Sequence, residues 1–374
     1  MTTFGVPVYG ASWVSSRSTD SDDNSRDGDK PPAKSLEYLV LTGGGGEGNS
    51  GIPNLLLLTE FDFSANSLSS EPVVRLEFTD EVPYRMAVHP KGDGLICAFP
   101  KSCRWFDWDT TNTSKNGRLG LKASDKVLTK LEDVGQQMAL AFSEDGSLLA
   151  VGGEDGKLRV FKWPSLEVLF NEEEAYTTVK DLHFSIDGKY LVSVGSGCPC
   201  KVWDVTLSEA VATLPQKNGE IFGFCRFSQT SERDQVLYTI DKCGSIISWN
   251  TKSWNRIVTK RIVRDTITAF NTSIDGKLLA IGTMEGDVLI INSSKMQVQM
   301  TVKKAHLIVV TALTFSHDSR ALASASMDSR IRVTLVEDKN VNGFNYWIIM
   351  LIILLAFAVM YLKSTQTKLL IKEV

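Results

Sequence analysis

The sequence lacks the features of nucleic-acid-binding, secreted and covalently catalytic proteins. Its 40 lysines and arginines are outnumbered by 44 acidic residues, giving a net charge of −4, and no long basic run occurs. A nucleic-acid partner is therefore not expected. The N-terminus has no charged segment followed by an apolar core, so no secretory signal peptide is predicted.

Cysteine and histidine are scarce and scattered, with 6 and 4 residues. Free buried thiols in a reducing compartment are expected. Cys198 and Cys200 could form half of a metal site, but no second pair of ligands lies nearby in the sequence. No Ser-His-Asp or Glu-x-x-His arrangement stands out, although the sequence leaves open an arrangement of catalytic residues that are distant along the chain. The histidines lie at equivalent edges of a repeat, where structural hydrogen bonding is the expected role: His89, His183, His306 and His317.

What the sequence does contain is a repeat. Four segments share an alternating strand that ends in a tight turn at Asp-Gly or Asp-Ser: 138–146, 180–188, 268–276 and 311–319. An apolar strand, a second turn and a third strand follow. The third strands place five residues in register, spaced 42, 46, 42 and 42 residues apart: Phe161, Trp203, Trp249, Ile291 and Val333. A period of this length with several strands per unit is typical of a WD-repeat β-propeller.

Earlier repeat units are more degenerate. The first uses residues 6–14 as its inner strand, then 36–42 and 55–63. Counting inner strands predicts an all-β fold, a seven-bladed WD-repeat β-propeller over residues 1–337. Residues 15–34 form a polar insertion that we expect to be disordered, and a second polar insertion, 109–126, lies in blade two. The sequence does not show how the ring closes at the last blade.

Residues 346–362 carry no charge, and with the two residues before them they are long enough to span a bilayer. Tyr346, Trp347 and Tyr361 stand at the two ends, as in an aromatic belt. We therefore predict one C-terminal transmembrane helix over 345–362, after a short linker, 338–344.

Two features of the sequence give opposite predictions for the orientation of this anchor. Lys363, Lys368 and Lys372 follow the span, and the positive-inside rule would place them in the cytosol. Translocation of a large folded domain would need a signal peptide, and none is predicted. We give the second argument more weight and expect a cytosolic propeller with a short lumenal tail, 363–374.

The most informative segment is a glycine-rich stretch between two strands, GGGGEGNSGIPN at 43–54. An ordinary hairpin loop has two to five residues, so twelve suggest a function. Gly43, Gly45 and Gly48 satisfy G-x-G-x-x-G, but β-rich sequence follows instead of the helix that a dinucleotide site needs. Glycine lets backbone groups converge on one point, so we expect the loop to enclose an ion or meet a partner; a plain surface loop is the alternative.

The propeller, the anchor and this loop in the first blade occur together in one family. The chain resembles the Sec-twelve-type guanine-nucleotide exchange factors, which activate the Sar small GTPase at the endoplasmic reticulum membrane and so initiate COPII coat assembly in ER-to-Golgi transport. The segment VPVYGA at 6–11 also fits the family's N-terminal strand. The resemblance implies exchange without covalent chemistry and a Sar-type partner in its GDP-bound and nucleotide-free states.

The resemblance further implies a potassium ion in the loop, held mainly by backbone oxygens. The matching positions are Gly43, Gly44, Gly45, Gly46, Glu47, Gly48, Asn49 and Gly51. Carbonyl oxygens suit a hard alkali cation. Asn54 matches the asparagine regarded as catalytically critical, and Ser50 stands where the family has another asparagine. Ile52, Pro53 and Asn54 are predicted to act on the partner, with Asn54 and Ile52 contacting its switch regions.

A non-catalytic trafficking facilitator is the main alternative. The family has plant relatives that help membrane cargo leave the endoplasmic reticulum and have lost the loop. This sequence retains the loop, which favours the exchange factor. A membrane-tethered WD scaffold for unrelated partners would rest on the fold alone.

Overall fold

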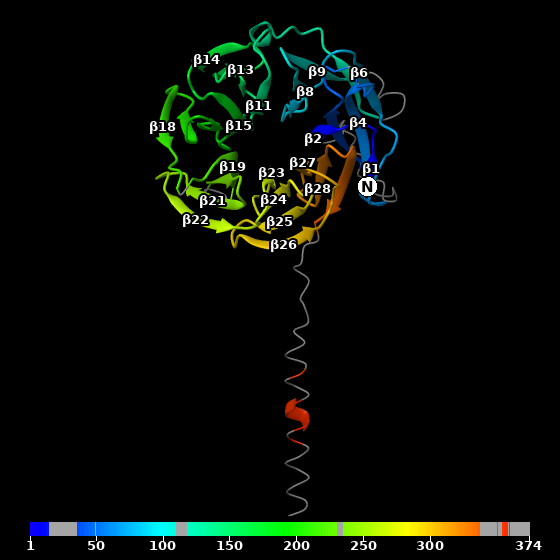
Figure 1. Ribbon diagram of the computed structural model, residues 1–374, viewed down its shortest axis with the longest axis vertical. Helices are drawn as coiled ribbons and strands as arrows, with labels where there is room; N and C mark the ends of the chain where they lie inside the picture. The colour runs from blue at the N-terminus through cyan, green and yellow to red at the C-terminus, as the bar shows by residue number, and fades with distance from the viewer. Residues whose placement is uncertain are drawn as a thin grey trace, which may run out of the picture. The chain divides into compact units, whose positions relative to one another are not determined.

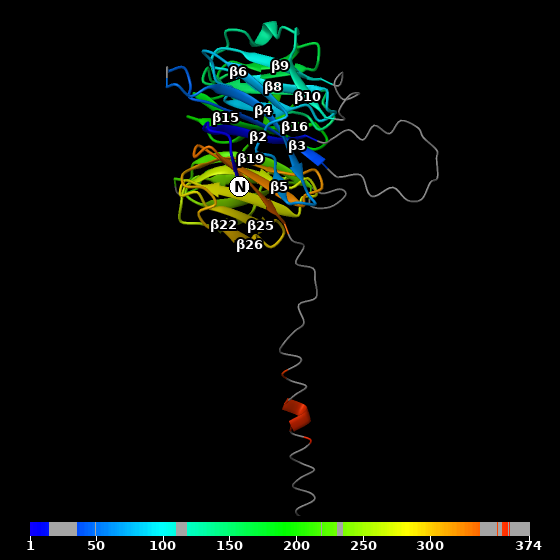
Figure 2. The same cartoon turned by 90° about the vertical axis from the view of Figure 1, so that its right-hand side faces the viewer.

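The computed structural model describes residues 1–14, 36–48, 50–109, 118–217, 219–229, 235–336, 350, 354–357 and 359. The chain divides into two units, Met1–Leu335 and Val336–Val374. In the first unit, seven antiparallel sheets form a ring (Figure 1), which Figure 2 shows from the side. The predicted all-β, seven-bladed propeller is confirmed.

Six blades follow one another along the chain. Blade one holds β2 (Val8–Val14), β3 (Leu36–Gly43) and β4 (Asn54–Asp62), with both β5 (Ser67–Leu68) and β6 (Val74–Phe78) paired to β4. Blade two holds β7 (Arg85–Val88), β8 (Gly94–Ala98), β9 (Cys103–Asp109) and β10 (Gly120–Ala123). Strand β10 lies within the stretch that the sequence presents as a polar insertion, so part of that insertion is the outer strand of the blade.

The next four blades are regular. The strands of blade three are β11 (Gln137–Phe142), β12 (Leu148–Gly153), β13 (Leu158–Lys162) and β14 (Glu167–Glu172), preceded by the 3-10 helix η1 (Thr129–Leu131). Those of blade four are β15 (Thr178–Phe184), β16 (Tyr190–Ser196), β17 (Lys201–Asp204) and β18 (Glu209–Thr213). Those of blade five are β19 (Phe222–Gln229), β20 (Gln235–Asp241), β21 (Ser245–Asn250) and β22 (Arg256–Arg261). Those of blade six are β23 (Ile267–Thr272), β24 (Leu278–Thr283), β25 (Val288–Asn292) and β26 (Gln297–Val302).

The repeated turns between the first two strands share one hydrogen-bond pattern. In blade three, the Ser143 hydroxyl donates to the Asp145 carboxylate at 2.6 Å and accepts from the Leu148 N–H at 3.0 Å. The same serine–aspartate bond recurs in later blades: Ser185–Asp187, Ser273–Asp275 and Ser316–Asp318. Hydrogen bonds from Ser143 and Ser147 lower the pKa of Asp145 to about 2. The aspartates that end the repeats are therefore turn residues, as the sequence predicts.

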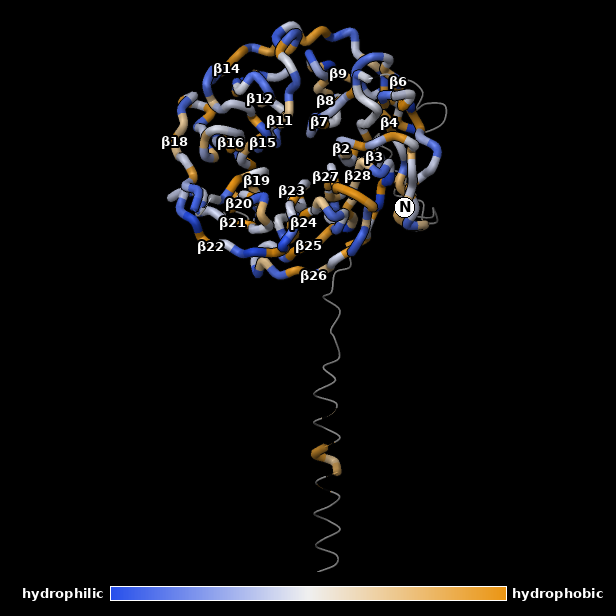
Figure 3. The backbone as a smooth tube through the Cα atoms, in the orientation of Figure 1, coloured by the Kyte–Doolittle hydropathy of each residue, from blue (hydrophilic) through white to orange (hydrophobic). Residues whose placement is uncertain are grey.

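The core lies between adjacent blades, and hydrophobic residues occur in strands all around the ring (Figure 3). The register residues of the third strands lie in this core. The indole N–H groups of the two tryptophans among them form hydrogen bonds within their own blades. Trp203 donates to the Ser193 hydroxyl at 2.7 Å and Trp249 to the Thr239 hydroxyl at 2.8 Å. His306 bonds Ser324 at 2.8 Å, a structural role of the predicted kind. All six cysteines are free, and four are buried, whereas Cys243 is exposed and Cys198 half-buried.

Blade seven is completed by the N-terminus. Its strands are β27 (Val310–Phe315), β28 (Ala321–Ser326) and β29 (Arg330–Leu335), and the outer strand is β1 (Thr2–Thr3). Thr2 pairs with Ile331 and Thr3 with Arg330, and the Phe4 N–H donates to the Ser329 carbonyl at 3.2 Å. We call this pairing the N-terminal clasp. It answers the question of ring closure that the sequence leaves open.

Deleting residues 1–4 should lower the midpoint of thermal unfolding by roughly 2–6 °C, because about 1–3 kcal/mol of strand pairing and of Phe4 packing is lost. Differential scanning calorimetry of the full chain measures the shift. Thr3→Ala is the matched control, since the exposed Thr3 side chain is removed while its backbone bonds stay. An unchanged midpoint for the deletion would show that the clasp contributes no stability.

Several predicted segments fall on residues that the structure does not describe. The insertion 15–34, the linker 338–344 and the tail 363–374 lie outside the described residues, as does most of the predicted span 345–362. Within that span, residues 350, 354–357 and 359 are helical, and 354–357 are hydrophobic (Figure 3). No helix among the described residues has the length and apolarity needed to cross a membrane.

Candidate functional site

The glycine-rich loop connects β3 to β4 in blade one. Its two ends are held in register, because Gly43 pairs with Leu55 across the two strands. Gly44, Gly46 and Gly51 have φ of 151°, 86° and 72°, a region that residues with a side chain rarely adopt. A Cβ atom on Gly44 would also lie 2.6 Å from the Asn54 Cα. Glycine is therefore required at Gly44 by both backbone conformation and packing.

Asn54 is an internal brace of this loop. It is the first residue of β4 and is 2% exposed. Its Oδ1 accepts from the Gly46 N–H at 3.0 Å, and its Nδ2 donates to the Gly46 carbonyl at 3.2 Å. One side-chain amide thus satisfies both backbone groups of Gly46, which fixes the path of the chain where a strand ladder has ended.

The loop is also fastened to the inner strand of its own blade. The Gly44 N–H donates to the Pro7 carbonyl at 3.0 Å, and the Tyr9 hydroxyl donates to the Gly44 carbonyl at 3.0 Å. The ring centroids of Tyr9 and Tyr84 are 5.5 Å apart. Burial raises the pKa of both tyrosines, and the charge of Glu47 raises the pKa of Tyr84 further, so both hydroxyls stay protonated at neutral pH.

The structure separates residues that the sequence analysis groups together. Ile52 is 39% exposed at the loop surface, Pro53 is half-buried, and Asn54 is buried. Among the predicted ion-binding positions, Gly43 and Gly44 are buried, Gly45 and Gly46 half-buried, and Glu47, Gly48 and Gly51 exposed. Asn49 lies outside the described residues. Only Ile52, of the three residues predicted to act on a partner, therefore presents a large exposed apolar side chain.

One face of the ring carries the loop, and we call it the loop face. Gly43 pairs near the start of inner strand β2, and the Thr311 hydroxyl at the start of β27 donates to the Val8 carbonyl at 2.6 Å. The turn from β28 to β29 and the segment leading into β27 therefore lie on the same face. In addition to Ile52, this face carries four exposed apolar side chains: Met284, Leu307, Ile308 and Met327. Single exposed apolar residues are common, but several on one face favour a protein-binding surface.

An acidic hollow of about 650 Å³ adjoins the loop. Its charged residues are Glu47, Glu77, Asp80, Glu81, Lys101 and Arg104. Two of the four carboxylates are already ion-paired, Glu81 with Arg104 and Glu77 with Arg75, which leaves those of Glu47 and Asp80 against Lys101. The excess negative charge favours a cationic group beside the loop.

A metal ion in this loop would depend on backbone oxygens. No group of three His, Cys, Asp or Glu side chains among the described residues could hold a metal. The carbonyls of Gly44 and Gly46 each accept one hydrogen bond and each keep a second lone pair. Such oxygens fit an alkali cation and suit a soft transition metal poorly.

Sequence reasoning missed the supports of the loop. Tyr9 lies in the segment 6–11, which the sequence analysis treats only as a strand, and Tyr84 carries no motif. An aromatic residue at the start of an inner strand is a weak signal, because most such residues belong to the core.

The ring of seven sheets and the repeated Asp-Gly turns define a WD-repeat β-propeller, and the family model "WD domain, G-beta repeat" matches residues 131–162 and 297–334. The chain belongs to the family of SEC12-like proteins. It is 49% identical over 359 residues to SEC12-like protein 2 of Arabidopsis thaliana, covering 93% of this chain and 91% of the relative. It is 30% identical over 282 residues to SEC12-like protein 1 of the same plant, covering 74% and 69%.

Exchange factors are among the similar proteins. The guanine nucleotide-exchange factor SEC12 of Mus musculus is 29% identical over 268 residues, which cover 63% of this chain and 62% of the mouse protein. The predicted family membership is confirmed, and the family contains proteins named as guanine-nucleotide exchange factors, which act without covalent chemistry and imply a small GTPase partner.

Proposed function

We propose that this chain is a guanine-nucleotide exchange factor for a Sar-type small GTPase and initiates COPII coat assembly at the endoplasmic reticulum membrane. The observation that carries the proposal is the braced glycine loop, in which Asn54 holds Gly46 and Ile52 is left exposed on the loop face. The similarity of the chain to SEC12 exchange factors supports the same activity.

The mechanism is differential binding and needs no proton transfer. A factor that binds the nucleotide-free GTPase more tightly than the GDP-bound form lowers the affinity of the GTPase for GDP by the same factor. Ile52 would insert between the switch segments, whose contacts to phosphate and magnesium hold GDP. Asn54 would act through Gly46, because its amide already bonds that residue's backbone. Whether Asn54 also touches the GTPase stays a prediction.

Potassium is the ion that we propose for the loop. The carbonyls of Gly44 and Gly46 would contribute to holding it, with Glu47 adding a nearby negative charge. When bound, the ion would supply a positive charge that offsets the entropic cost of ordering a glycine-rich segment. Tyr9 and Asn54 would keep the two carbonyls in place through the bonds that they already make.

Residues 345–362 are proposed as the membrane anchor, on their length and lack of charge. The propeller would then lie on the cytosolic side of the endoplasmic reticulum, where a small GTPase could reach the loop face.

A non-catalytic facilitator of cargo exit is the second candidate. It is favoured by one observation: a relative with 49% identity is named SEC12-like and not an exchange factor. The loop, with its glycines at positive φ and its brace at Asn54, argues for exchange, because a facilitator would have no need of a segment that is so costly to order.

The purified full chain should accelerate GDP release from a Sar-type GTPase by about 100-fold, with at least about tenfold less acceleration when sodium replaces potassium. Tryptophan fluorescence of the GTPase reports the nucleotide change. Magnesium chelation, which releases GDP without any exchange factor, confirms that the GTPase is competent. No acceleration in either salt would favour the facilitator, and equal acceleration in both would remove potassium from the proposal while leaving the exchange activity.

A further inference from the structure

The centre of the propeller contains a second polar site, separate from the loop. Residues from all seven inner strands line a cavity of about 240 Å³. Its charged lining residues are Arg85 on β7, Lys180 and Asp181 on β15, and Arg226 on β19. Three cations thus share the cavity with one carboxylate.

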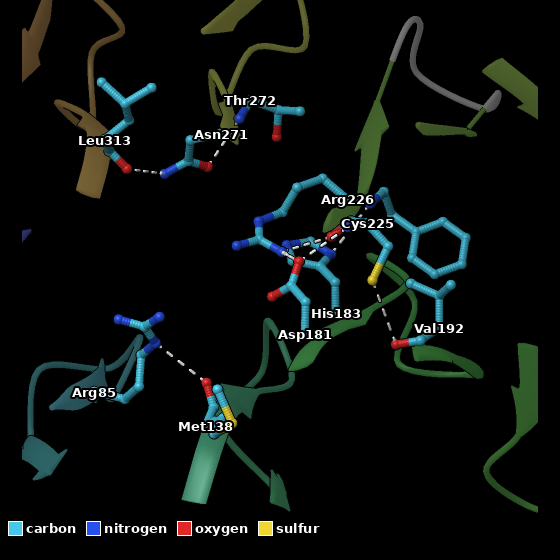
Figure 4. A network of polar contacts seen from close by, with 11 residues as sticks. Arg85, Met138, Asp181, His183, Val192, Cys225, Arg226, Asn271, Thr272 and Leu313 are labelled. Atoms are coloured by element: carbon cyan, nitrogen blue, oxygen red, sulfur yellow. Dashed lines mark hydrogen bonds and ion pairs between the residues drawn. The ribbon is translucent and has the colours of Figure 1, made fainter. Parts of the chain in front are cut away.

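That carboxylate is already committed to one cation. Asp181 pairs with the Arg226 Nη1 at 2.5 Å and also accepts the Cys225 N–H at 2.9 Å, as Figure 4 shows. Asn271, on β23, is committed as well, since its amide donates to the Leu313 carbonyl at 2.8 Å and accepts the Thr272 N–H at 2.8 Å. Neither Arg85 nor Lys180 forms an ion pair with a described residue. The cavity therefore holds an uncompensated charge of about two positive units.

Arg85 is held by hydrogen bonds to backbone carbonyls but also has N–H donors without a described partner. Its Nε donates to the Met138 carbonyl at 3.2 Å, and its Nη1 donates to the carbonyls of Tyr9 and Tyr84, both at 3.3 Å. These bonds connect three neighbouring blades, so Nε and Nη1 have a structural role. Nη2 has no hydrogen-bond partner among the described residues and is not among their buried unsatisfied atoms, so it is accessible to solvent, and Arg85 lines the cavity.

Burial lowers the pKa of Arg85, an effect that the carboxylate of Asp181 opposes and the like charge of Arg226 reinforces. Burial also lowers the pKa of Lys180, and the like charge of Lys242 lowers it further. These directions mean that each charge is held at a cost in free energy. Arginine stays protonated in proteins, and Asp181 offsets the burial of Arg85 only in part, so a bound anion would stabilise its charge further. The guanidinium and ammonium groups are the donors that proteins use for oxyanions.

The size of the cavity restricts the ligand. Sites for drug-sized molecules usually have about 300–1,000 Å³, whereas a water molecule takes up about 30 Å³. We propose that the central cavity, which Arg85 and Lys180 both line, binds a small oxyanion of the phosphate class. A dianion matches the uncompensated charge, and a nucleotide would be too large.

The site lies close to the loop through a short chain of bonds. Arg85 donates to the Tyr9 carbonyl, and the Tyr9 hydroxyl donates to the Gly44 carbonyl. A bound oxyanion would thus hold the arginine that supports the strand on which the loop is fastened. The proposal does not depend on the exchange activity, because the residues that carry it are outside the loop.

Isothermal titration calorimetry of the full chain with inorganic phosphate, at constant ionic strength set by chloride, tests the site. We expect one phosphate per chain and at least about tenfold weaker binding in Lys180→Met, from the loss of one charge–charge contact. Lys180 is the preferred variant because no described hydrogen bond of the fold depends on its side chain, whereas Arg85→Gln would also unfasten three blades.

Lys295→Met is the matched control. Lys295 is exposed in the turn between β25 and β26, away from the cavity, and its loss removes the same charge from the protein. Phosphate affinity should stay at the wild-type value in this variant. No phosphate binding beyond the chloride background, or equal weakening in both lysine variants, would overturn the proposal, as would binding of ATP as tight as that of phosphate.

Discussion

Asn54→Ala should reduce the acceleration of GDP release by about 100-fold or more. The substitution leaves the N–H and carbonyl of Gly46 without their partner, and an unmet polar group in a half-buried loop costs about 1–3 kcal/mol. A glycine-rich segment without its brace samples many conformations, so the conformer that fits the GTPase becomes rare. The exchange rate measured by tryptophan fluorescence should fall accordingly.

The fold should survive this change, because the pairing of Asn54 with Phe78 uses backbone groups only. Asn250→Ala is the matched control. The Asn250 Oδ1 also braces a turn, accepting the N–H groups of Lys252 and Ser253, both at 2.9 Å, but Asn250 ends β21 at the turn to β22, on the opposite face. Wild-type exchange by Asn54→Ala would refute the proposed role, and equal losses in both variants would indicate a general effect of turn disruption.

Ile52→Asp should have an effect of similar size for a different reason. A charge placed at the centre of an apolar contact costs several kcal/mol of binding free energy, which corresponds to about 100-fold or more in affinity. Since Ile52 is 39% exposed, the midpoint of thermal unfolding should change little. Surface plasmon resonance with the nucleotide-free GTPase measures the lost affinity, and the exchange assay measures the lost rate.

Ile274→Asp provides the comparison for Ile52. Ile274 is 57% exposed in the turn between β23 and β24, on the face opposite the loop. It should bind and exchange as the wild type does. If Ile52→Asp kept wild-type affinity, the partner would contact another part of the molecule, and the apolar residues of the loop face would need to be tested one by one.

The blades could be predicted from the sequence because each one repeats the same local physics. An alternating strand, a Ser-x-Asp turn and a buried aromatic or β-branched residue recur at a fixed period. The N-terminal clasp could not be predicted, because Thr2 and Thr3 are too short a strand to carry a pattern. Their partner, β29, stands at the far end of the ring, and nothing local in either sequence identifies the other.

The loop was predictable as an element, but its internal order was not. Glycine composition indicates a turn with positive φ, which the structure confirms at Gly44 and Gly46. It does not indicate that Asn54 turns inward, since asparagine bonds backbone groups and partner molecules equally well. The charged residues of the central cavity could not be predicted as a group either. Arg85, Lys180 and Arg226 lie on different strands, and only the closure of the ring brings them together.

The clasp also fixes the order in which the molecule can be completed during synthesis. Strand β1 leaves the ribosome before the other described strands, and its partner β29 leaves after them. The nascent protein must therefore keep β1 unpaired while six blades form. Once β29 has been synthesised, its outer edge stays unpaired until β1 pairs with it. Unpaired edges invite association with other chains, so chaperone occupancy should be highest in that interval and should end when the ring closes.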